Sequence, residues 1–97
     1  MTQETHEPVV EHDEAGHRYV LRIDGEEAGE LGYSVDGDRV VMEHTVVDRS
    51  RREKGLGSRL AAFALDDVRA SGRRVVPQCP FVAAYVADHP EHADLVD

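Results

Sequence analysis

Two glycines one residue apart follow a dense group of basic side chains in the middle of the chain. Gly55 and Gly57 allow the backbone to turn sharply and to approach a ligand closely. The helix expected to begin here directs free N–H groups and a partial positive charge at the same loop. A phosphate or pyrophosphate is the guest that such a loop favours. The basic residues nearby are Arg49, Arg51, Arg52, Lys54 and Arg59, with the single acid Glu53 among them.

The glycine spacing alone leaves a plainer interpretation open. It matches neither the dinucleotide-binding fingerprint nor the P-loop, because Leu60 stands three residues after Gly57 and no Gly-Lys-Ser/Thr follows a four-residue gap. An ordinary helix start preceded by a solvated, arginine-rich loop fits the same residues. The anion site is therefore a hypothesis that needs a second motif.

Two further side chains have the chemistry of catalysis. Cys79 is the only cysteine, so it forms no internal disulfide, and a thiol can act as nucleophile or proton donor. The alternative is a small, buried, apolar side chain. His44 lies in an expected strand, where an imidazole can act as base or proton relay. Its alternative is a structural histidine paired with a carbonyl.

The remaining polar residues are assigned no chemistry. His89 and His92 are not predicted to bind a metal, because Pro90 interrupts the helix that would carry them. No metal site is expected anywhere in the chain. Surface positions are predicted for His6, His12, His17, Asp66 and Asp67.

Hydrophobic periodicity indicates which elements position these residues. Apolar alternation predicts strands over 9–12, 17–23, 28–35 and 39–47, with turns at Asp24-Gly25 and Asp36-Gly37-Asp38. In the fourth strand, Val40, Met42, His44 and Val46 are expected to share one face. Helical spacing over 56–70 follows, then a short strand over 73–78 and a short helix over 81–88. Residues 1–8 are predicted to be a disordered N-terminus, and residues 9–97 a single α+β domain.

Composition excludes several classes of protein. The chain has 97 residues, enough for one domain, with 40% hydrophobic and 32% charged residues. Its 11 basic and 20 acidic residues give a net charge of −9, which argues against binding to nucleic acid or an anionic membrane. No apolar run approaches the roughly 20 residues that span a bilayer, and the first residues lack signal-peptide features. The expected protein is cytoplasmic, and a monomer or weak dimer.

The sequence on both sides of Gly55 and Gly57 makes the interpretation of this loop more specific. The stretch Arg52-Glu53-Lys54-Gly55-Leu56-Gly57 resembles the Arg/Gln-x-x-Gly-x-Gly/Ala acyl-CoA loop of the GNAT N-acetyltransferase superfamily. Residues 44–47, 75–85 and 89–91, which include Cys-Pro-Phe-Val-Ala-Ala-Tyr, resemble the compact, single-domain YjdJ-like branch, so the likeness covers residues 9–96. Two positions depart from that branch, because Glu53 stands where Gly is common and Val46 where Glu is common.

The resemblance implies a fold and an activity. The fold would be a mixed sheet, mostly antiparallel with two parallel, splayed strands, flanked by one long and one short helix. The activity would be transfer of an acetyl group from acetyl-CoA to an amine of a protein or small molecule. The alternatives are a catalytically weak module that binds or senses CoA, and a small acidic interaction protein that keeps only the fold.

The same resemblance assigns the site residues. Cys79 would lie near the thioester, either as nucleophile or as proton donor to the leaving thiolate, and His44 is the candidate base. Pantetheine would pair with the edge of the fourth strand, and the pyrophosphate would rest on the loop amides. The implied cofactor-binding residues are Thr45, Val46, Val47, Arg52, Glu53, Lys54, Gly55, Leu56, Gly57 and Ser58.

Overall fold

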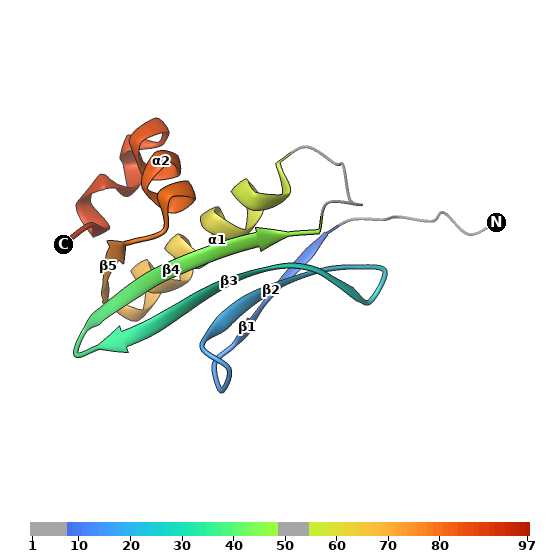
Figure 1. Cartoon of the computed structure of the whole chain (residues 1–97). Helices are drawn as coiled ribbons and strands as arrows, with labels where there is room; N and C mark the ends of the chain where they lie inside the picture. The colour runs from blue at the N-terminus through green and yellow to red at the C-terminus, as the bar shows by residue number, and fades with distance from the viewer. Residues whose placement is uncertain (1–7, 49–54) are drawn as a thin grey trace.

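Four antiparallel strands and one parallel strand form a single mixed sheet in the computed structural model, which describes residues 8–48 and 55–97 (Figure 1). The strand order is β1-β2-β3-β4-β5, and only the β4–β5 pair is parallel. This architecture confirms the predicted fold class. The strands are β1 (Val9–Asp13), β2 (Arg18–Ile23), β3 (Glu26–Asp36), β4 (Arg39–Val47) and β5 (Arg74–Pro77).

In the described residues, three helices accompany the sheet. The long helix α1 (Leu56–Ser71) lies across one face, while α2 (Pro80–Asp88) and the 3-10 helix η1 (Pro90–Leu95) gather beside β5 (Figure 1). The sequence predicted helices over 56–70 and 81–88, which correspond to α1 and α2, and η1 follows them as a third, short helix. No helix in the described part of the chain is long and apolar enough to cross a membrane.

The inner face of the sheet holds the core. Tyr19, Leu21 and Ile23 of β2 point toward α1, as their alternation predicted, and pack with Leu60 and Leu65 of that helix. On the opposite, outer face Val20 is only 1% exposed, although its cross-strand neighbours on β1 and β3 are Glu11 and Glu30. Acidic side chains therefore flank Val20 on both sides of the outer face.

Two β-bulges change which side chains share a face. Leu21 pairs with Gly29 but Arg22 pairs with Glu27, so Ala28 is an extra residue in β3. In β4 the extra residue is Glu43, because Gly32 pairs with His44 while Tyr33 pairs with Met42. A single inserted residue moves every later side chain to the other face.

The bulge in β4 corrects the predicted face of His44 and Val46. Both were expected beside Met42, which is buried in the core, but both are exposed on the outer face. Thr45 and Val47 take the inward positions instead, and Val47 packs against the core. The physical reason is the inserted Glu43, whose carboxylate accepts a hydrogen bond from Ser34.

Two polar residues expected at the solvated surface instead link β1 to α1. His12 lies between Asp67 (Nδ1 to Oδ2, 3.1 Å) and the Tyr33 hydroxyl (Nε2 to Oη, 2.6 Å), and its ring stacks on Tyr19 at 4.3 Å. Tyr19 donates a hydrogen bond to Asp67 at 2.8 Å. Burial, reinforced by the Asp67 carboxylate, raises the pKa of Tyr19. His12 and Asp67 are therefore paired and only partly exposed, with side chains 26% and 40% exposed, while Asp66 and His17 are exposed as expected.

Candidate functional site

The parallel strands separate after a short paired segment. β4 and β5 pair from Arg39 and Arg74 to Met42 and Pro77, and the Cys79 amide then donates to the Met42 carbonyl at 2.8 Å. β4 continues to Val47, beyond the end of β5 (Figure 1). Within residues 8–48 and 55–97, no strand pairs with this edge of β4 after Met42. A strand edge of this kind can accept an extended, amide-containing ligand.

Cys79 lies where the pairing of β4 and β5 ends, on the inner side of β4. It is the N-cap residue of α2, is 3% exposed, and is a free thiol. Its Sγ lies 3.3 Å from Oγ1 of Thr45, so the structure brings together a predicted catalytic residue and a predicted cofactor-binding residue.

His44 lies on the other side of β4. Its side chain is 50% exposed, and Nε2 lies 2.9 Å from Oε2 of Glu30 on β3. The structure therefore does not place His44 next to Cys79. The two predicted catalytic residues instead lie on opposite faces of the strand whose edge is open.

The start of α1 is suited to an anion. Gly55 adopts a left-handed conformation (φ 82°) as the N-cap and supplies no side-chain cap, and the first turn contains no acid. The amides of this turn therefore keep the favourable field of the helix terminus for a ligand. Leu56 is buried in the core, Ser58 is half-buried and Arg59 is exposed.

Gly57 allows a close packing contact. A Cβ at this position would lie 2.8 Å from Cζ of Phe81, so the ring of α2 rests against the first turn of α1. Sequence reasoning assigned no role to Phe81, because an aromatic residue two positions after a cysteine reads as ordinary core. The ring is nevertheless 41% exposed.

Several predicted residues cannot be placed. Arg52, Glu53 and Lys54, together with Arg49 and Arg51, lie outside the described residues. Their part in binding phosphate stays a prediction, as does the effect of the acid at Glu53.

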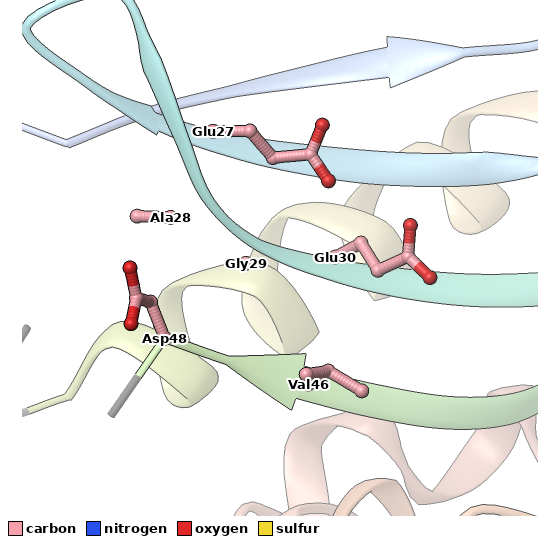
Figure 2. Close-up of a pocket in the computed structure, with 6 residues that line it drawn as sticks. All are labelled: Glu27, Ala28, Gly29, Glu30, Val46 and Asp48. Atoms are coloured by element: carbon pink, nitrogen blue, oxygen red, sulfur yellow. The ribbon is translucent and has the colours of Figure 1, made fainter. Parts of the chain in front are cut away.

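The outer face has a hollow where β3 begins and β4 ends. A cavity of about 360 Å³ is lined by Glu27, Ala28, Gly29, Glu30, Val46 and Asp48 (Figure 2). Glu27 and Glu30 leave β3 on the same side because the bulge at Ala28 offsets the normal alternation. The hollow therefore combines acidic side chains with the exposed side chain of Val46.

Glu30 is a residue that the sequence analysis missed. It is the cross-strand partner of Val46, so a carboxylate stands beside position 46 although the chain itself has Val there. Its pKa is lowered by hydrogen bonds from His44 and Arg18. No local signal could have identified it, because the register that brings it to His44 depends on the bulge in β4.

Comparison with known proteins adds evidence of a different kind. The family model for GCN5-related N-acetyl-transferase matches residues 18–95. Protein NATD1 of Gallus gallus is 31% identical over 83 residues, which cover 84% of this chain and 76% of that protein.

Solved structures show the same fold. A GCN5-like putative N-acetyltransferase of Staphylococcus aureus superposes with a TM-score of 0.70 at 16% identity, over 92% of this chain and 87% of that chain. N-acetylglutamate synthase of Neisseria gonorrhoeae, solved with coenzyme A and N-acetyl-glutamate, gives a TM-score of 0.54 at 22% identity, over 61% of this chain and 15% of that chain.

Proposed function

This chain belongs to the GCN5-related N-acetyltransferase family, and on that premise we propose that it transfers an acetyl group from acetyl-CoA to an amine. The observation that carries the proposal is the open edge of β4, which runs from the Cys79 thiol to the start of α1. These are the three parts that an acyl-CoA needs: a thioester position, an edge for its amides and a cradle for its phosphates.

The binding residues follow from this arrangement. The backbone of Thr45, Val46 and Val47 would pair with the pantetheine amides. The amides of Gly55, Leu56, Gly57 and Ser58 would face the pyrophosphate, with Arg52, Glu53 and Lys54 contributing from the preceding loop.

Acetyl-CoA supplies an activated acyl group, and the chain must manage two protons. As the new carbon–nitrogen bond forms and the carbon–sulfur bond breaks, the amine loses one proton and the leaving thiolate gains one. We assign His44 to the first transfer, because its imidazole is exposed on the outer face. We assign Cys79 to the second, because its buried thiol is already held by the Thr45 hydroxyl.

Binding is tested first. At about 100 times Kd, acetyl-CoA should add roughly 2.7 kcal/mol to the free energy of unfolding, a melting shift on the order of 10 °C for a domain of this size. The absence of any shift would overturn the proposal. A melting shift without release of free CoA thiol, over a panel of small amines and lysine peptides, would instead favour the alternative function of a module that binds or senses CoA.

The role of Cys79 is tested separately. Cys79→Ala should keep the acetyl-CoA melting shift and lose turnover, and intact-mass spectra of the parent should show no acetyl adduct on the protein. An adduct that Cys79→Ala lacks would show that Cys79 is the nucleophile of a covalent route.

A further inference from the structure

Both carboxylate oxygens of Glu30 are engaged, each by a different side chain. Oε1 accepts a hydrogen bond from the Arg18 guanidinium at 2.9 Å, and Oε2 lies 2.9 Å from Nε2 of His44. Arg18 is in turn held by Asp13 and Glu27, both at 3.1 Å. The Glu30 side chain is therefore fixed in one orientation toward His44.

The His44 ring packs against Gly32, a position without a side chain. Gly32 is the cross-strand partner of His44, and a Cβ there would lie 2.3 Å from Cε1 of the ring. Any other residue at this position would push the ring away from the sheet. Gly32 and Glu30 together hold the imidazole flat on the outer face.

This contact determines which nitrogen is free. A carboxylate beside Nε2 favours the neutral tautomer that carries its proton on Nε2. The lone pair is then on Nδ1, which makes no hydrogen bond with any residue of 8–48 or 55–97. The His44 side chain is 50% exposed on the outer face, where an approaching molecule can reach the ring.

We infer that Glu30 is the positioning residue for His44, and that Nδ1 of His44 is the atom that accepts the proton of the acceptor amine. This inference rests on the proposed function and adds a residue and an atom to it. The proton leaves the amine nitrogen as the carbon–nitrogen bond forms, and the imidazolium produced is neutralised by Glu30. From the exposed ring the proton passes to solvent, which restores the neutral tautomer.

The chain offers a matched control in Glu27. Both Glu27 and Glu30 contact Arg18 and line the same hollow, but only Glu30 touches His44. With the amine that the panel identifies, Glu30→Gln should lower kcat/KM about tenfold or more and leave the KM for acetyl-CoA within about twofold. Glu27→Gln should stay within about twofold of the parent in both. Equal losses in the two variants would overturn the inference, because only overall charge would then matter.

Two further tests address the position of the His44 ring, and the first of them does not depend on activity. Nitrogen-15 NMR of the His44 ring should show the Nε2-protonated tautomer in the parent and in Glu27→Gln, and a mixture of tautomers in Glu30→Gln. Gly32→Ala should displace the ring and lower kcat/KM while Glu30 stays intact. A mixed tautomer in the parent would refute the inference even if the enzyme is active. A parent that neither binds nor uses acetyl-CoA would instead refute the proposed function.

Discussion

Gly57→Ala sets helix propensity against a single packing contact. Alanine is favoured over glycine inside a helix by about 1 kcal/mol. The new methyl group, however, would stand 2.8 Å from Cζ of Phe81, closer than carbon atoms approach. Because that atom is the far end of a side chain that is 41% exposed, the ring can swing outward and give up its contact with α1. We expect the loss to be about 1 kcal/mol, since the ring is partly solvated already. The two effects should nearly cancel.

The cancellation is tested with a double-mutant cycle. In the parent, Gly57→Ala should change the free energy of unfolding by less than about 0.5 kcal/mol. In a Phe81→Ala background the clash is absent, so the same change should stabilise by about 1 kcal/mol, which raises the melting temperature by roughly 4–8 °C. Urea unfolding of the four proteins measures the coupling between the two positions.

One result would refute the reasoning. If Gly57→Ala has the same effect in both backgrounds, Phe81 is not what requires a glycine there. Acetyl-CoA binding then gives the second test of the contact. Gly57→Ala should weaken binding even where it leaves stability unchanged, because it adds a methyl group to the first turn of α1, whose amides are proposed to face the pyrophosphate.

Three other changes have expected outcomes. Asp67→Ala should destabilise the protein by about 1–3 kcal/mol, since it leaves the buried Tyr19 hydroxyl without its acceptor. The control Asp66→Ala, one residue away and exposed, should change the free energy of unfolding by less than about 0.5 kcal/mol. Equal effects of the two variants in urea unfolding would contradict this prediction. Gly55→Ala should cost about 1–2 kcal/mol, because its φ of 82° is strained for any residue with a Cβ, and thermal unfolding measures the cost. The pKa of Glu30 is lowered from 4.5 by hydrogen bonds from His44 and Arg18, so its contribution to stability is complete above that value and is lost as pH falls through the folded-state pKa. The free energy of unfolding should therefore decline less between pH 6 and pH 3 in Glu30→Gln than in the parent. Equal declines in the two proteins would contradict this stabilising role of Glu30.

Much of the fold could be predicted because its signals are local. The Asp24-Gly25 turn has positive φ at both residues, 54° and 82°, as a tight hairpin requires, and it fixes the β2–β3 connection. The bounds of β4 agree with the prediction from its apolar run. The start of α1 at Leu56 agrees with the prediction from the change to helical spacing.

The candidate site was harder to predict from the sequence, because it depends on the register between strands. Nothing near Glu43 in the sequence indicates a bulge, yet this one residue turns His44 outward and Thr45 inward toward Cys79. Likewise the sequence does not distinguish Asp67 from Asp66. Only the pairing of β1 with β2 places His12 next to Asp67. Contacts between residues far apart in the chain decided both cases.

The placement of Cys79 and His44 on opposite sides of β4 limits the chemistry that the two can share. Cysteine proteases rely on an imidazole touching the sulfur, which draws off its proton and keeps a thiolate–imidazolium pair ready. Here the backbone of a strand intervenes, and the sulfur meets a threonine hydroxyl instead. Thiol and imidazole can therefore serve the same reaction only as independent groups, one on each flank of whatever lies along the strand edge.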